Sequence, residues 1–224
     1  MKLYFHPGST TSRPVVHFAA DNKIALDFQV IDLFTGEHLG EAYAKVNPSK
    51  MVPMLEDGDF RLSESSAILK YLADKANSPA YPKDLKQRAR VNEMMDWFNT
   101  NLYRSLAYGL VYPQVFAHMK AADPKVQEAN LATGKERTRH WLGILERDLM
   151  GPGKKYLCGG QITIADYLGL SMITIGDVVR CDFGPYPNIR RWITNMKATP
   201  GYAKTYEVFA GFVGSVKDQK FRAI

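Results

Sequence analysis

The sequence predicts an α/β domain followed by an all-α domain. Before residue 76, strand and helix patterns alternate, whereas beyond residue 84 apolar residues recur only at helical spacing. The stretch 76–84 between them is rich in proline, serine, asparagine and aspartate, as interdomain linkers are. We therefore expect a first domain at residues 1–76, a linker at 77–84 and a helical domain at 85–224.

The first domain begins with a strand, a helix and a second strand. Residues 3–5 are a short apolar run, and residues 26–33 alternate in polarity, so both are expected to be strands. Residues 12–20 between them are expected to form a helix. Ser12 suits its N-cap, and Pro14 lies in its first turn, where a missing amide hydrogen costs nothing. This order starts a parallel β-α-β unit.

A hairpin and another helix complete this domain. After a short helical stretch at residues 39–45, apolar runs at 52–56 and 60–62 flank an Asp-Gly pair, which is a strong hairpin signal. Ser63 is expected to cap the helix that follows. The first domain is thus expected to have the order β-α-β-α-β-β-α.

The second domain is expected to contain only helices. Its helical segments carry apolar residues at intervals of three and four and show no strand alternation. They span residues 85–117, 124–149, 164–179, 187–196 and 202–211.

Composition argues for a globular protein without a nucleic-acid partner. Hydrophobic residues make up 46% and charged residues 23% of the chain, as in ordinary folded domains. The net charge is +6, but the lysines and arginines are spread among acids without a dense basic tract. That distribution disfavours nucleic acid and suits a small anionic ligand.

The sequence also predicts a cytoplasmic location. The N-terminus has no apolar run typical of a signal peptide, and no stretch approaches the roughly 20 apolar residues of a membrane-spanning helix. The two cysteines, Cys158 and Cys181, indicate neither a disulfide framework nor a zinc site. We expect no membrane association and no metal.

Four separated motifs resemble, in order and spacing, those of the soluble glutathione transferases. They are Pro7-Gly8-Ser9, Met51-Val52-Pro53, Glu64-Ser65 and the capping box Thr163-Ile164-Ala165-Asp166. The segment 28–73 is most similar to the theta class and its delta relatives. The resemblance covers essentially the whole chain. It implies a thioredoxin-like N-terminal domain, an α-helical C-terminal domain and an enzyme that activates the thiol of glutathione.

By this resemblance, Ser9 stands at the place of the catalytic serine of theta-like enzymes. A free thiol with a pKa near 8.5 is only about 3% ionised at pH 7, so the main task is to stabilise the thiolate. A donating hydroxyl, helped by the positive end of the first helix, suits that task. The hydroxyls of Thr10, Ser12 and Tyr4 are alternatives, and Ser9 as a plain turn residue is another. Beta-class relatives carry cysteine where Thr10 stands, which argues against thiol–disulfide chemistry.

The resemblance also implies how glutathione is held. The Val52-Pro53 bond is expected to be cis and to expose the Val52 backbone for pairing with the cysteinyl backbone of the tripeptide. Glu64 and Ser65, at a helix start, are expected to bind the γ-glutamyl carboxylate and ammonium. The alternatives are a plain strand-opening proline and simple helix capping.

The glycyl carboxylate is expected to contact basic side chains. In theta- and delta-like relatives, residues at the places of His38 and Lys50 bind it. Met51 stands where theta relatives carry lysine, so the contact would rest on His38 and Lys50 alone.

The electrophile is expected to bind between the domains, near Ser9 and beside Tyr103, Arg104 and Tyr108. These helical residues, with Asn99 and Tyr112, could equally form bundle core. The expected activity is conjugation of small hydrophobic electrophiles, with dehalogenation or peroxide reduction as variants, glutathione as co-substrate and no cofactor. A non-catalytic binding or assembly module of the same fold is the competing interpretation. The resemblance further implies a homodimer, and residues 206–224 partly covering the active site.

Overall fold

The computed structural model describes residues 1–224 and contains one four-stranded sheet with the order β2-β1-β3-β4. The strands are β1 (Lys2–Phe5), β2 (Asp27–Val30), β3 (Met54–Asp57) and β4 (Phe60–Ser63). β1 pairs in parallel with β2 and antiparallel with β3, and β3 and β4 form the expected hairpin. The helices of this part are α1 (Arg13–Asp21), α2 (Glu41–Ala44) and α3 (Ser65–Lys75). The sequence therefore predicted the element order correctly.

All regular elements after residue 84 are helical, as expected. They are α4 (Leu85–Trp97), π-helical turns at Phe98–Leu102 and Arg104–Val111, α5 (Tyr112–Val115), α6 (Pro124–Ile144), α7 (Ile164–Thr174), α8 (Pro187–Lys197) and α9 (Tyr202–Ser215). A further π-helical turn, Leu145–Met150, extends α6, and a 3-10 turn, Ile175–Val179, extends α7. Another 3-10 turn, Ala117–Met119, follows α5. None of these helices combines the length and apolar character needed to cross a membrane.

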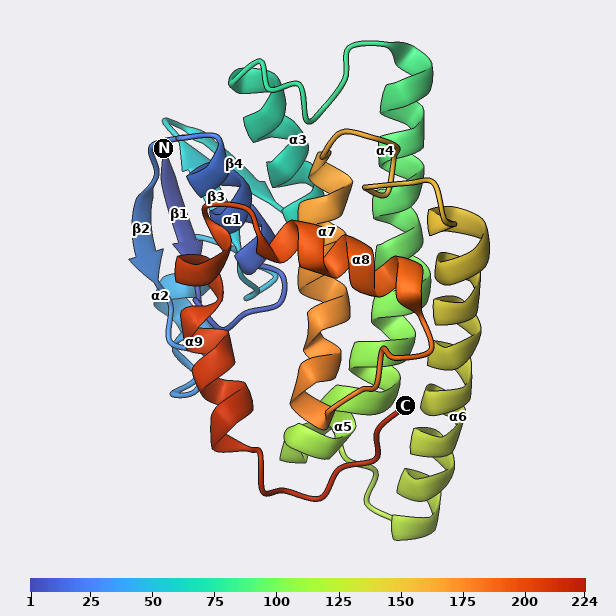
Figure 1. Ribbon diagram of the computed structural model, residues 1–224. Coiled ribbons are helices and arrows are strands. Elements are labelled where there is room, and N and C mark those ends of the chain that lie inside the picture. Colours follow the sequence, from blue (N-terminus) through green and yellow to red (C-terminus); the bar gives the residue numbers. More distant parts are fainter.

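Helix α7 is the centre of the molecule. In Figure 1 it lies between the sheet with α1 on one side and the long helices α4 and α6 on the other. Every one of its residues is buried. Leu3 and Phe18 of the first domain belong to the same apolar cluster as Phe98 and Trp192 of the second. The α/β domain and the helical domain are thus joined by a continuous core, and the predicted fold class is confirmed.

Two helix starts differ in detail from the sequence prediction. Ser12 occupies the N-cap position of α1 as expected, but its side chain makes no cap bond and instead accepts a hydrogen bond from the His6 amide at 3.4 Å. Ser63 is the last residue of β4, and the N-cap position of α3 is occupied by Glu64, whose φ is 67°. Serine favours N-caps, but the hairpin strand extends one residue further than its apolar run and includes Ser63. The capping box at Thr163 is present as expected.

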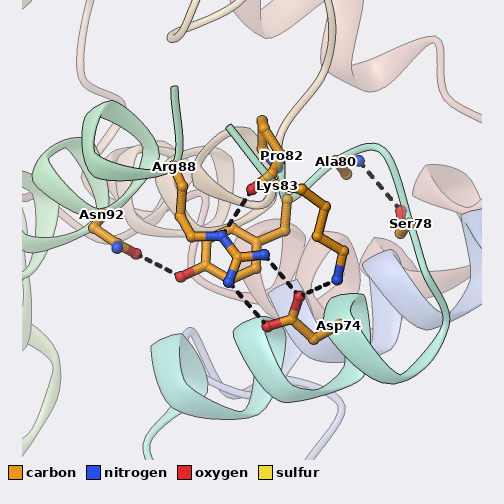
Figure 2. Close-up of polar contacts among 8 residues, drawn as sticks. Asp74, Ser78, Ala80, Pro82, Lys83, Arg88 and Asn92 are labelled. Atoms are coloured by element: carbon orange, nitrogen blue, oxygen red, sulfur yellow. Dashed lines mark hydrogen bonds and ion pairs between the residues drawn. The ribbon is translucent and has the colours of Figure 1, made fainter. Parts of the chain in front are cut away.

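The segment between α3 and α4 is fixed by polar contacts, as Figure 2 shows. The Asp74 carboxylate accepts hydrogen bonds from Arg88 Nη2 at 2.8 Å and from Lys83 Nζ at 2.9 Å. Arg88 Nε also donates to the Pro82 carbonyl at 2.7 Å. The end of α3, the connection and the start of α4 therefore form one bonded unit. The exact domain bounds, 1–76, 77–84 and 85–224, stay a prediction.

Candidate functional site

A cavity of about 410 Å³ lies where the α/β domain meets the helices. Its walls come from the turn after β1, the loop before β3, the start of α3 and the π-helical turns after α4. Of the residues expected from the sequence, it brings together Val52, Pro53, Glu64, Ser65, Tyr103, Arg104 and Tyr108. Ser9, His38 and Lys50 do not line it.

The loop before β3 presents the backbone of Val52 at this cavity. The Val52-Pro53 bond is cis, as the resemblance implied. The preceding carbonyl, of Met51, accepts hydrogen bonds from Tyr43 Oη and Asn47 Nδ2, both at 2.8 Å. Burial raises the pKa of Tyr43 to about 12, so its hydroxyl stays a donor at neutral pH. Val52 itself has a carbonyl that accepts from Thr11 Oγ1 at 2.8 Å and an amide with no partner in the protein.

Ser9 lies in the turn after β1, and the Thr11 hydroxyl stands between the Ser9 hydroxyl and the cavity. The Ser9 amide donates to the His6 carbonyl at 3.0 Å, which closes the turn. Ser9 Oγ lies 3.1 Å from Thr11 Oγ1 and accepts from the Ser12 amide at 3.2 Å. Thr11, unlike Ser9, lines the cavity. Ser9 is therefore connected to the cavity through Thr11.

The alternative hydroxyls lie elsewhere. Thr10 is buried, and its side chain accepts from Tyr112 Oη at 3.1 Å, on the side of the helical domain. Ser12 is fully buried, and the Tyr4 ring packs edge-on against Tyr43 at 6.2 Å between centroids. None of these three lines the cavity. Of the four hydroxyls proposed from the sequence, that of Ser9 is linked to the Val52 backbone by the shortest hydrogen-bonded path, which runs through Thr11.

A buried positive charge lies beneath this turn. The Arg13 guanidinium is almost completely inaccessible and has no carboxylate within ion-pairing distance. It stacks on Phe209 at 3.7 Å, and its Nε donates to the Ser9 carbonyl at 3.4 Å. Burial lowers the pKa of Arg13, and the surrounding tyrosines oppose this shift. A buried cation without an ion-pair partner in contact favours an anion bound near Ser9.

The start of α3 keeps its polar groups open to the cavity. Glu64 is exposed and has a positive φ of 67°, which is uncommon for a residue with a side chain. Such conformations cluster at ligand-binding sites. Neither the Glu64 carboxylate nor the Ser65 hydroxyl caps the helix. The first amides of an α-helix also lack intrahelical acceptors, so this helix start has an unused carboxylate, hydroxyl and set of donors at the cavity wall.

His38 and Lys50 lie outside the cavity but close to each other. Lys50 Nζ donates to the carbonyl of Leu39, the residue that follows His38. His38 is half-buried, and its Nδ1 has no hydrogen-bond partner. Lys50 directly precedes Met51, which lines the cavity.

The tyrosines after α4 contribute to both the core and the cavity wall. Tyr103 is buried, lines the cavity and shares a 2.8 Å hydrogen bond with Tyr112 Oη. Burial raises the pKa of both phenols, so they remain protonated. Tyr108 is 45% exposed, and Arg104 is exposed without an ion pair. The residues expected to cover the site, 206–224, do not line this cavity; the tail instead bonds Gln114 through the Arg222 backbone.

Sequence reasoning missed three residues of the cavity wall, Thr11, Asn47 and Ser63, the last of which was expected only to cap α3. Thr11 stands in a run of four hydroxyl residues, and only the shape of the turn separates it from Thr10. Asn47 precedes Pro48 in the loop before the Val-Pro motif, a position typical of side chains that bond nearby backbone.

Comparison with known proteins identifies the family. The N-terminal domain model of glutathione S-transferases matches residues 1–74, and the C-terminal domain model matches residues 111–200. Human glutathione S-transferase theta-1 is 36% identical over 204 residues, which are 90% of this chain and 84% of the relative.

Solved structures agree with this match. A delta-class glutathione transferase of Nilaparvata lugens superposes with a TM-score of 0.79 at 33% identity, covering 96% of this chain and 98% of the other. Human glutathione transferase theta-2, solved with glutathione and an unknown ligand, gives 0.81 at 26% identity, covering 100% and 93%. With both domain models matched and a theta-class relative aligned along most of its length, the chain belongs to the glutathione S-transferase family and is a glutathione transferase.

Proposed function

We propose that this glutathione transferase uses the Ser9 hydroxyl to stabilise the thiolate of glutathione for attack on small hydrophobic electrophiles. The observation that carries the proposal is the bonded path from Ser9 through Thr11 to the Val52 backbone. A tripeptide paired with Val52 brings its cysteinyl side chain toward this turn. The start of α1 and the buried Arg13 guanidinium both add positive potential there.

The rest of the tripeptide would be held along the same wall. The Val52 amide is free to donate to the cysteinyl carbonyl, in the manner of strand pairing. The start of α3 offers amides and the Ser65 hydroxyl to the γ-glutamyl carboxylate, and Glu64 to its ammonium. Lys50 and His38 would take the glycyl carboxylate once the Lys50 ammonium leaves the Leu39 carbonyl.

The electrophile would bind against Tyr103, Arg104 and Tyr108. The exposed face of Tyr108 supplies apolar surface, and the unpaired Arg104 supplies positive charge for a leaving group. Conjugation is the expected reaction, and dehalogenation and peroxide reduction would use the same thiolate. Rates over alkyl halides, aryl halides and organic peroxides would rank these substrates.

The protein is further proposed to work as a cytoplasmic homodimer. Exposed apolar side chains on both domains, Met51 and Phe60 on the first and Val126 on the second, offer surface for a two-fold interface. Sedimentation at micromolar concentration should give twice the mass of one chain. A single-chain mass would refute the dimer.

The test of the mechanism is Ser9→Ala. Glutathione affinity should stay within a few-fold, because Val52, Glu64 and Ser65 hold the tripeptide independently. The thiol pKa should rise, and losing about 2 to 3 kcal/mol of thiolate stabilisation should lower the rate at pH 7 roughly 30- to 150-fold. Absorbance titration of the bound thiolate and the pH profile of chlorodinitrobenzene conjugation measure both effects.

Two outcomes would contradict the proposal. If Ser9→Ala keeps the wild-type thiolate titration while Thr10→Val or Ser12→Ala abolishes it, the donor is another hydroxyl. If the wild-type protein is neither retained on immobilised glutathione nor active with chlorodinitrobenzene, the non-catalytic module becomes the better interpretation.

A further inference from the structure

The hydroxyls of Ser9 and Thr11 and the Val52 carbonyl form a chain that has only one arrangement of hydrogens. A carbonyl can only accept, so Thr11 donates its single hydrogen to Val52 at 2.8 Å. In the 3.1 Å contact between the two hydroxyls, Ser9 must therefore be the donor. The Ser12 amide donates to Ser9 Oγ at 3.2 Å. In this structure, the Ser9 hydrogen thus points to Thr11.

This arrangement conflicts with the proposed role of Ser9. Ser9 already donates to Thr11 the hydrogen that it would have to donate to the sulfur. The Val52 backbone can resolve the conflict, because its amide is free and its carbonyl is occupied only by Thr11. Strand-like pairing uses both groups, so the cysteinyl amide of glutathione competes with Thr11 for the Val52 carbonyl.

We propose that Thr11 is a positioning residue whose hydroxyl moves from the Val52 carbonyl to Ser9 when glutathione binds. The proposal rests on the proposed function of Ser9. After the move, Ser9 Oγ accepts from Thr11 and from the Ser12 amide, and its own hydrogen is free for the sulfur. Only hydrogen bonds change, so every hydroxyl keeps its hydrogen. A donor that itself accepts hydrogen bonds is polarised by them, which strengthens its bond to the thiolate.

The test is Thr11→Val, which replaces the hydroxyl by a methyl group of similar size. The pKa of the bound thiol should rise, and the ratio of thiolate to thiol at pH 7 should fall about threefold to tenfold, as expected for one neutral hydrogen bond. Thr11→Ser keeps the hydroxyl and should restore the wild-type titration. Thr10→Val is the matched control, since the Thr10 hydroxyl bonds Tyr112 on the other side of the turn; it should leave the thiol pKa unchanged.

A double-mutant cycle separates positioning from direct contact. Because Thr11 acts through Ser9, Thr11→Val should change the thiolate fraction less than about twofold in a Ser9→Ala background. An equal effect in both backgrounds would mean that Thr11 contacts the sulfur itself. An unchanged or lowered thiol pKa in Thr11→Val would mean that Thr11 only competes for the Ser9 hydrogen. Either result overturns the proposal.

Failure of Ser9 itself has a different signature. If Ser9→Ala alone leaves the titration unchanged, the function proposed for Ser9 fails, whatever Thr11→Val does. Circular dichroism and thermal unfolding check that each variant folds. If Thr11→Val does not fold, Thr11→Ala carries the same expectations, because it also removes the hydroxyl.

Discussion

Helices α3 and α7 begin with similar side chains and use them in opposite ways. At α7, the buried Asp166 carboxylate accepts from the Thr163 amide at 2.7 Å and from its hydroxyl at 2.9 Å. At α3, Glu64 and Ser65 carry the same kinds of group, yet neither caps the helix, and both face the cavity. The hydrogen-bonded, or satisfied, start of α7 stabilises the fold. The unsatisfied start of α3 leaves its carboxylate and hydroxyl available to a ligand.

The largest expected effect is on stability, at the start of α7, whose polar groups are hydrogen-bonded. Asp166 also accepts from the Leu157 amide at 2.8 Å and from Trp192 Nε1 at 2.9 Å, so one carboxylate joins the loop before α7, α7 itself and α8. Asp166→Ala leaves these buried donors without an acceptor, at about 1 to 3 kcal/mol each. We expect a loss of more than about 3 kcal/mol in the free energy of unfolding.

Urea denaturation measures this loss. Asp59→Ala is the matched control, because Asp59 is exposed and has no side-chain partner; its effect should stay within about 0.5 kcal/mol. A similarly small effect at Asp166 would show that the capping box does not stabilise this fold.

At a third helix start, that of α9, the first backbone amide is hydrogen-bonded by a side chain of α1. The neighbouring histidine of α1 makes stability depend on pH. The Gly201 amide donates to Asp21 Oδ1 at 2.6 Å, and His17 Nε2 lies 2.6 Å from Thr199 Oγ1. Thr199 donates to the Met196 carbonyl, so His17 is the donor to Thr199. His17 Nδ1 is buried without a partner. A second proton on the ring would therefore have no acceptor.

Burial lowers the pKa of His17 to about 4, although the nearby Asp21 opposes this shift. Between the normal value and about 4, the unfolded chain binds a proton that the folded protein does not. The free energy of unfolding should therefore have its full value above pH 6.5 and decrease as the pH falls toward 4, by up to about 3 kcal/mol. His17→Gln should remove this part of the pH dependence, whereas replacing the exposed His140 by glutamine should not. Parallel stability curves for wild type and His17→Gln would contradict the assignment.

At the start of α3, whose side chains do not cap the helix, the expected effect is on glutathione binding. Glu64→Ala removes the carboxylate proposed to hold the ammonium of glutathione. A charge-assisted hydrogen bond contributes about 1.5 to 3 kcal/mol, so affinity should fall roughly 10- to 150-fold. The free energy of unfolding should change by less than about 0.5 kcal/mol, because the side chain makes no contact that stabilises the helix.

Calorimetric titration with glutathione measures the affinity change. Glu207→Ala, on the exposed face of α9, is the matched control and should bind normally. If Glu64→Ala binds like the wild type but unfolds more easily, the residue is structural and the contrast with α7 disappears.

The same contrast explains what the sequence could predict. The capping box and the Val-Pro motif depend on residues close together in the chain, and the structure has both. The positive φ of Glu64 depends on where β4 ends, which the polarity pattern placed one residue too early. Which hydroxyl of the turn reaches Val52 depends on a contact across 41 positions. The cap of α9 by Asp21 spans 180 positions. Local sequence rules carry no information on such long-range partners.

The smallest expected effect compares the two hydroxyls that were both expected to act at helix starts. Thr163→Ala removes a hydroxyl bonded to a buried carboxylate and should cost about 1 to 2 kcal/mol of stability. Ser63→Ala should change stability by less than about 0.5 kcal/mol, because Ser63 ends β4 and does not cap α3. Urea denaturation of the two variants under the same conditions gives the comparison directly. Equal losses would mean that Ser63 caps α3 in solution, and then Glu64 would lose the open helix start on which its proposed role depends.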